Sequence, residues 1–263
     1  MQNIDHYENF PVASWLCPPQ LRPAVLALYR FARTADDLAD EGPASADERR
    51  AALLHFRADL TASLADGAQH ISAKWPQIFG PLGRFAAQYQ LPPVLLHDLL
   101  DAFEQDVAYT EAGRGYACRA ELLDYCRRSA NPVGRLLLHM CGVDDDISLT
   151  QSDAICTALQ LINFWQDRSQ DLARGRDYLP QHHSLAEELQ FARDLLCKGA
   201  PLVHRVAGRF GWELRLVVQG GLRVLDKLPA IHLQDYPDQR YLPRPRLNRK
   251  DMVTVLWRAV CMS

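Results

Sequence analysis

The chain has 263 residues, of which 48% are hydrophobic and 23% charged, a balance typical of a globular protein with a substantial core. Its formal net charge of −3 shows no basic excess, so nucleic-acid binding is set aside. Seven scattered cysteines without a C-x-x-C pair, no secretory signal and no apolar run of about 18 residues indicate a cytoplasmic protein with reduced thiols, whose membrane contact can only be peripheral.

Helical periodicity recurs along the chain and is interrupted by proline and glycine, which are typical of helix ends. Pro18-Pro19 and Pro23 precede the first predicted helix, which ends at Glu41-Gly42-Pro43. The later helices are predicted at residues 45–65, 77–89, 93–110, 119–140, a stretch ending at Gly175, 184–198, 201–228 and 248–260.

Two local signals refine this pattern. Asn131-Pro132 falls inside 119–140, where the proline ring must disturb the hydrogen-bond ladder. Thr150 and Asp153 have the spacing of a capping box for the helix that ends at Gly175. Since we find no strand alternation and no internal repeat, the prediction is an all-α, single-domain helical bundle over residues 1–263, with a central active-site cavity between facing helices.

Two of the predicted helices carry polar side chains at steps of three or four residues, which places them on one helix face. The first stripe consists of Tyr29, Arg33, Asp36 and Asp40, and the second of Asn163, Asp167 and Asp171. The other faces are rich in apolar residues, so the carboxylates should lie largely inside, where like charges repel and need a partner. Mg²⁺ prefers oxygen ligands and shares its shell with substrate phosphates. For either stripe alone, a solvated face with Arg33 or Arg168 as an ion-pair partner is the alternative; the matched pair favours a metal site.

The two stripes resemble the paired aspartate-rich motifs of the head-to-head isoprenyl diphosphate synthases, the squalene and phytoene synthase family. Further segments that resemble family motifs follow in the same order between residue 6 and about residue 180: His6-x-x-Asn9-Phe10, Tyr29-x-x-x-Arg33, Tyr125-Cys126-x-x-Ser129-Ala130-x-x-Val133-Gly134 and Gly175-Arg176-Asp177-Tyr178-Leu179-Pro180. The resemblance implies an isoprenoid-synthase-type helical bundle that ionises a prenyl diphosphate with Mg²⁺.

Within this family, residues 6–15 and 163–167 most resemble the bacterial hydroxysqualene synthases. That resemblance implies conversion of presqualene diphosphate to hydroxysqualene, with release of diphosphate and capture of the carbocation by water, in squalene and hopanoid biosynthesis. A sister presqualene diphosphate synthase and a downstream flavin reductase would be its partners. Presqualene diphosphate, squalene or phytoene synthesis stays open, as does a non-catalytic partner that binds prenyl diphosphates.

The resemblance, together with the chemistry of the side chains, predicts three groups of site residues. The expected metal ligands are Asp36, Asp37, Asp40, Asn163, Asp167 and Asp171. The expected substrate-binding residues are His6, Asn9, Phe10, Arg33, Phe164 and Arg176, and the expected catalytic residues are Tyr29, Tyr125 and Asn131. A guanidinium matches phosphate geometry, although an ion pair with Asp36 or Asp37 is the alternative for Arg33. Helix capping is the alternative for His6 and Asn9, and a plain core position for the aromatic residues.

Two departures from the family pattern lead to further hypotheses. Asn131 stands where the family usually has glycine, and we expect it to help hold the water that quenches the cation. Gln166 stands where several relatives carry arginine, which leaves open whether Arg168 contacts the diphosphate instead. No dinucleotide-binding fingerprint is present, so hydride transfer from NADPH is less favoured.

A basic cluster lies toward the C-terminus, and it comprises Arg240, Arg244, Arg246, Arg249 and Lys250. A solvated loop explains it most simply. The functional alternative is a peripheral contact with anionic headgroups at the inner face of the cell membrane, which would help to hand over a C30 substrate.

Overall fold

The computed structural model describes residues 16–66, 72–228 and 244–262, and these residues form α-helices and one 3₁₀-helix without any strand. In chain order the helices are α1 (Arg22–Asp40), α2 (Ala46–Asp66), α3 (Pro76–Tyr89), α4 (Pro93–Glu111), α5 (Arg119–Ser129), α6 (Asn131–Met140), α7 (Asp146–Ala173), α8 (Leu185–Gly199), η2 (Ala200–His204), α9 (Gly208–Lys227) and α10 (Arg249–Val260). The prediction of an all-α fold is confirmed.

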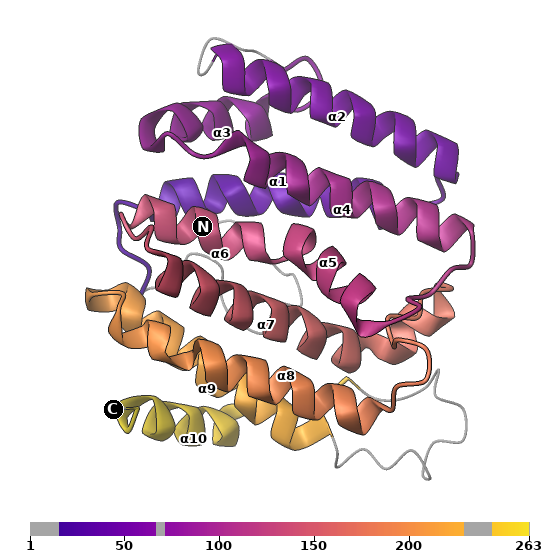
Figure 1. Ribbon diagram of the computed structural model, residues 1–263. Coiled ribbons are helices and arrows are strands. Elements are labelled where there is room, and N and C mark those ends of the chain that lie inside the picture. Colours follow the sequence, from indigo (N-terminus) through magenta and orange to yellow (C-terminus); the bar gives the residue numbers. More distant parts are fainter. Residues whose placement is uncertain (1–15, 67–71, 229–243, 263) are drawn as a thin grey trace.

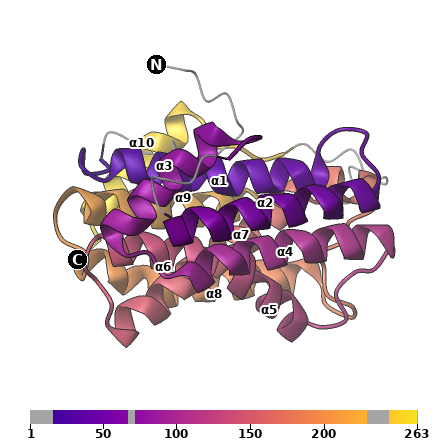
Figure 2. The same cartoon turned by 90° about the horizontal axis from the view of Figure 1, so that it is seen from above.

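The helices run side by side, with axes roughly parallel or antiparallel in two perpendicular views (Figures 1 and 2). α1 to α4 occupy one end of the bundle, and α8 to α10 occupy the other. α7 is the longest helix, with 28 residues, and lies in the middle. Each end has its own hydrophobic core: the first includes the stacked rings of Phe31 and Phe56, and the second is built on Leu161, Ile162 and Trp165 of α7.

Most predicted helix bounds agree with the structure to within two residues, and the break predicted at Asn131-Pro132 separates α5 from α6 at Ala130, which has φ −121° and ψ −48°. The capping box predicted at Thr150 and Asp153 is wrong. The Asp145 side chain caps α7 instead, by accepting a hydrogen bond from the Ser148 backbone N–H at 3.0 Å, so Thr150 lies one turn inside the helix.

The helix predicted over 201–228 is also interrupted. η2 ends at His204, and α9 begins only at Gly208, whose φ of +69° is in the left-handed region that favours glycine. Gly211 explains the tight junction, because a Cβ there would lie 2.2 Å from the Val206 carbonyl oxygen. The chain therefore turns sharply before it enters α9.

The sequence of α1 places its acids beside the core and not in it. Leu28, Phe31, Ala35 and Ala39 are buried along one face. The stripe from Tyr29 to Asp40 begins one residue later, about 100° around the helix. α1 therefore anchors itself with one face and presents carboxylates on the next.

Gly134 brings α6 close to α7. A Cβ at Gly134 would lie 2.4 Å from Ser152 Oγ and 2.5 Å from Cys156 Sγ, so only a glycine fits without movement of these side chains. The preceding residue, Val133, faces the cavity that lies between α1 and α7. The close approach therefore sets one wall of the site.

Candidate active site

A cavity of 410 Å³ separates α1 from α7, and residues of α4, α5, α6 and the segment after α7 complete its wall. Five acidic side chains face it, namely Asp36, Asp40, Asp106, Asp167 and Asp171. The amides of Gln160 and Asn163 face it as well. The cavity therefore gathers oxygen donors from three helices that are far apart in the sequence.

Five of the six predicted metal ligands line this cavity, and they are Asp36, Asp40, Asn163, Asp167 and Asp171. Asp37 is not among the lining residues, and its Oδ1 pairs with Arg33 Nη2 at 2.7 Å. The one-residue step from Asp36 turns Asp37 about 100° away. The structure thus brings the two predicted stripes face to face and leaves Asp37 beside them.

Arg33 belongs to the first stripe and pairs with three carboxylates. Its guanidinium is 2.8 Å from Asp36, 2.7 Å from Asp37 and 2.8 Å from Glu41. The ion-pair alternative for Arg33 is therefore present in the structure, yet the same side chain also lines the cavity. These carboxylates raise the pKa of Arg33 despite its burial, so it stays a cation facing the site.

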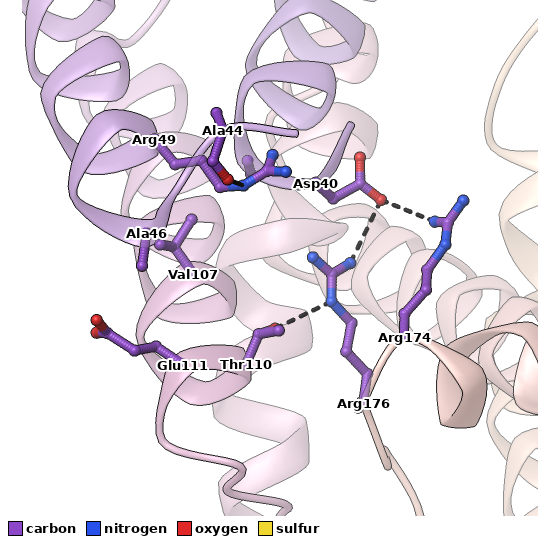
Figure 3. Close-up of a pocket in the computed structure, with 10 residues that line it drawn as sticks. Asp40, Ala44, Ala46, Arg49, Val107, Thr110, Glu111, Arg174 and Arg176 are labelled. Atoms are coloured by element: carbon purple, nitrogen blue, oxygen red, sulfur yellow. Dashed lines mark hydrogen bonds and ion pairs between the residues drawn. The ribbon is translucent and has the colours of Figure 1, made fainter. Parts of the chain in front are cut away.

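Two more arginines reach Asp40 from the end of α7, 134 and 136 positions away in the chain. Arg174 Nη1 is 3.0 Å and Arg176 Nη1 is 3.4 Å from Asp40 Oδ2, and Figure 3 shows both guanidinium groups pointing at this carboxylate. Arg176 also donates from Nε to Thr110 Oγ1 at 3.0 Å. The pocket of Figure 3, with a volume of 390 Å³, shares Asp40 and Arg176 with the central cavity. Two guanidinium groups therefore converge on one oxygen of Asp40.

A third cation approaches the second stripe. Arg244 Nε lies 2.7 Å from Asp167 Oδ1, and the Arg244 side chain is only 13% exposed. Gln166 Nε2 donates to the neighbouring Pro245 carbonyl at 2.7 Å. A solvated loop is therefore the wrong interpretation for Arg244, whereas Arg246, Arg249 and Lys250 are exposed; Arg240 lies outside the described residues.

Asp106, which the sequence analysis missed, organises an aromatic wall of the cavity. The Tyr125 hydroxyl donates to Asp106 Oδ2, and the Tyr178 hydroxyl to Oδ1 at 3.5 Å. Phe164 stacks on Tyr178 with ring centroids 3.8 Å apart. Burial raises the pKa of Asp106 to about 6, while the hydrogen bond from Tyr125 opposes the rise. A single acid within the apolar stripe of Leu99, Phe103 and Val107 was the signal that could have identified it.

Gln160 is a second residue that the sequence analysis missed. It lies three residues before Asn163 and so extends the second stripe by one turn at helical spacing. Tyr178 belongs to a motif that was recognised, but it was given no role. Spacing alone could have identified Gln160; the contact between Tyr178 and Asp106 needed the fold.

Burial and mutual repulsion both act on the carboxylates of the two stripes. Burial raises the pKa of Asp36 to about 7, and the nearby Asp40 adds to the rise. Burial also raises the pKa of Asp171 to about 7, and Asp167 adds to it. These carboxyl groups therefore titrate near neutral pH. A cation that binds them would favour their deprotonated form.

Three predicted residues lie outside the described part of the chain, and these are His6, Asn9 and Phe10. Tyr29, Tyr125, Phe164 and Arg176 all line the cavity.

Asn131 does not line the cavity, and its Oδ1 accepts a hydrogen bond from Thr157 at 2.9 Å. Its placement therefore gives no support to a water-holding role. Arg168 pairs with Asp177 at 2.6 Å and does not line the cavity either, so nothing in its placement supports a diphosphate contact.

An apolar cavity of 340 Å³ adjoins the polar one. The two share Tyr29, Ala32 and Val133, and the rest of the apolar wall comes mainly from aliphatic side chains of α1, α6, α7 and α9. The site is therefore amphipathic, with carboxylates and arginines at one end and hydrocarbon at the other.

The donor set fits a hard divalent cation, because carboxylate and amide oxygens face one another across the cavity. Asp40 Oδ1 is buried and accepts no hydrogen bond within the described residues, which leaves it available as a ligand atom. In that part of the chain no three His, Cys, Asp or Glu side chains already converge on one point. Asp36, Asp40 and Asp167 are each drawn to an arginine instead.

Comparison with known proteins places this geometry in a family. Residues 5–188 match the squalene/phytoene synthase family model. The chain is 38% identical over 176 residues to a hydroxysqualene synthase of Zymomonas mobilis, covering 66% of this chain and 54% of that protein. It is 30% identical over 173 residues to a presqualene diphosphate synthase of the same organism, covering 66% and 56%. The chain thus spans about half the length of these curated relatives.

The fold is shared with solved structures. Squalene synthase HpnC from Alicyclobacillus acidocaldarius superposes with a TM-score of 0.74 at 33% identity, covering 90% of this chain and 91% of that one. A dehydrosqualene synthase in complex with ligand shows the same fold with a TM-score of 0.63 at 18% identity. With a family match over most of its length and relatives at 38% identity, the chain belongs to the squalene/phytoene synthase family.

Proposed function

We propose that the protein converts presqualene diphosphate to hydroxysqualene, with Mg²⁺ as cofactor. The observation that carries the proposal is the pair of facing oxygen-donor stripes on α1 and α7, which share one cavity with arginines and open toward an apolar cavity. Similarity to hydroxysqualene synthases at 38% identity supports the choice of reaction within the family.

In this proposal the diphosphate lies at the polar end. Asp36, Asp40, Asn163, Asp167 and Asp171 would hold Mg²⁺, which would supply positive charge to the leaving oxygens. Arg33, Arg174, Arg176 and Arg244 are close enough to the same carboxylates to turn toward phosphate oxygens. The C–O bond breaks, and its electron pair leaves with the diphosphate.

The hydrocarbon part of the substrate would lie in the apolar cavity, whose wall is mainly aliphatic. The rings of Tyr125, Tyr178 and Phe164 line the polar cavity, where the C–O bond would break, and ring faces there would stabilise positive charge. Water then adds through its oxygen and loses one proton, which gives the alcohol. The reaction consumes presqualene diphosphate and water and yields hydroxysqualene, diphosphate and a proton.

A sister presqualene diphosphate synthase would supply the substrate, and a flavin reductase would consume the alcohol. We infer a cytoplasmic protein that contacts the membrane peripherally, because its C30 hydrocarbon substrate would partition into lipid. None of the helices in the described ranges is long and apolar enough to cross a membrane.

The test is a single-enzyme incubation with Mg²⁺ and without NADPH, once with farnesyl diphosphate and once with presqualene diphosphate. We expect hydroxysqualene from presqualene diphosphate alone, with one ¹⁸O atom incorporated when the water is labelled. Asp40→Asn should lower the rate at least tenfold, whereas Asp47→Asn, at a side chain that is 90% exposed on α2, should not change it. Formation of presqualene diphosphate or of a C30 hydrocarbon from farnesyl diphosphate would assign the protein a different reaction of the same family. If neither substrate is turned over, the result would favour a non-catalytic protein that binds prenyl diphosphates.

A further inference from the structure

The last helix exposes its wide apolar face. Met252, Val253, Leu256, Trp257 and Val260 of α10 are each 40% or more exposed. Val253, Leu256, Trp257 and Val260 follow the steps i, i+3, i+4 and i+7, so they form one stripe. α10 lies at the edge of the bundle (Figure 1).

The opposite face attaches α10 to the protein. Asp251, Val255 and Ala259 are buried there. Asp251 accepts from Arg223 at 2.8 Å and from Lys227 at 2.7 Å on α9. The exposed stripe is therefore not needed to hold α10 in place, although a helix usually buries its more apolar face.

The charges around the stripe have one sign. Arg249, Lys250 and Arg258 are exposed on α10, whereas Asp251, the only acid of this helix, is buried. Arg258 reaches Asp226 on α9 at 3.2 Å. A cationic rim around an apolar stripe is found on a chain with a formal net charge of −3, so this surface complements an anionic one.

Arg215 links α10 to an exposed tryptophan of α9. Arg215 of α9 donates to the Ala259 carbonyl at 3.3 Å, and its guanidinium lies 5.0 Å from the ring of Trp212. Trp212 is 47% exposed. Phe210 and Leu214, each two residues from Trp212, line the apolar cavity, and so does its direct neighbour Glu213. One helix, α9, therefore links the exposed stripe to the hydrocarbon end of the site.

We propose that α10 and Trp212 form the surface by which this protein rests on a bilayer with anionic headgroups. α10 would lie in the plane of the interface, with its apolar stripe at the acyl boundary and its cations among the headgroups. Tryptophan is enriched at this depth because its ring is amphipathic. This proposal rests on the proposed function in one respect only: the hydrocarbon substrate gives the protein a reason to contact lipid.

A second copy of the chain fits this surface less well. A twofold dimer centred on α10 would bring Arg249, Lys250 and Arg258 of both copies together, and like charges at such a contact oppose association. Lipid headgroups of opposite charge remove that conflict. The residues of the basic cluster therefore serve two different surfaces. Arg244 faces the active site, whereas Arg249 and Lys250 flank the apolar stripe.

The test is flotation of the full chain with neutral vesicles and with vesicles containing phosphatidylglycerol, at low and high salt. We expect binding to anionic vesicles that weakens with salt. The double variant Val253→Ser/Trp257→Ser should reduce the bound-to-free ratio at least tenfold, and Arg249→Gln/Lys250→Gln should remove the preference for anionic lipid. Leu54→Ser is the matched control, because Leu54 is 63% exposed on α2, away from the proposed surface. This variant should bind vesicles as wild type does.

Circular dichroism and thermal unfolding check that the stripe variant is folded, and light scattering measures the mass of wild type without lipid. Absence of vesicle binding by wild type overturns the proposal, and so does undiminished binding by a folded stripe variant. A dimer that the stripe variant abolishes would assign the surface to a second copy. Flotation needs no turnover, so its outcome is independent of the reaction.

Discussion

Asp106 lies on the buried face of α4, one residue before Val107, and its carboxylate holds the hydroxyls of Tyr125 and Tyr178. These two phenols and Phe164 form the aromatic side of the cavity. A buried carboxylate that accepts two hydroxyl hydrogen bonds fixes both rings more firmly than packing alone. Asp106 therefore positions the wall that would face the carbocation.

Asp106→Asn keeps the shape of the side chain but removes the charge that accepts both hydroxyls. We expect kcat to fall by about ten- to a hundredfold, since hydrogen bonds to charged groups contribute about 1.5–3 kcal/mol. Steady-state kinetics on presqualene diphosphate measures this, together with product analysis for premature quenching. Tyr116→Phe is the control, because Tyr116 packs on the same rings but does not bond Asp106. A rate equal to wild type in Asp106→Asn would contradict the positioning role.

The raised pKa values of Asp36 and Asp171 predict how stability depends on pH. Both lie at about 7 in the folded protein against an ordinary value of 3.8. Between these limits the folded state binds protons that the unfolded state has released. Stability of the metal-free protein should therefore fall as pH rises through 7. Thermal unfolding in EDTA between pH 5 and 8 should show this fall.

Magnesium should oppose the trend, because a divalent cation binds the deprotonated carboxylates and stabilises the folded state more at high pH. Asp36→Asn/Asp171→Asn should flatten the pH dependence in EDTA, whereas Asp47→Asn should leave it as in wild type. A midpoint that rises with pH in EDTA would contradict the assigned shifts.

At the scale of elements, periodicity was enough to find the helices, because each helix buries a stripe at 3.6-residue spacing whatever its neighbours are. Periodicity failed at helix ends, where backbone conformation and capping determine the boundary. Gly208 and Gly211 force a turn that the apolar pattern of 201–228 does not reveal, and Asp145 outcompetes Thr150 as the cap of α7. A given sequence often offers several residues that could cap a helix, and the packing of the folded chain decides which one does.

Gly134→Ala tests the close contact of α6 with α7. The new methyl group would lie within 2.5 Å of Ser152 Oγ and Cys156 Sγ, so these side chains must leave their positions or the two helices must separate. We expect the free energy of unfolding to fall by about 1–3 kcal/mol. Gly80→Ala on α3 is the control, since a Cβ there meets nothing within 4 Å and alanine should stabilise the helix by about 0.5–1 kcal/mol. Equal stability of the Gly134 variant and wild type, measured by urea unfolding, would contradict the tight-contact account.

At the scale of the whole molecule, the site lies where the two cores meet. The stripes could be predicted to face each other because each is polar on an otherwise apolar helix. Contacts that join distant segments could not be predicted, such as Arg174 with Asp40 and Arg244 with Asp167. Nothing in local spacing distinguishes Arg244, which turns inward, from Arg249, which stays exposed. The roles of both depend on the path of the folded chain.

The most direct measurement of the central claim, that α1 and α7 jointly hold a metal-bound diphosphate, is calorimetric titration of the protein with inorganic pyrophosphate. We predict binding with Mg²⁺ and at least tenfold weaker binding in EDTA. Asp40→Asn on α1 and Asp171→Asn on α7 should each weaken the Mg²⁺-dependent binding, while Asp47→Asn should not. Equal affinity with and without Mg²⁺, or a loss caused by variants of only one of the two helices, would contradict a site shared between them.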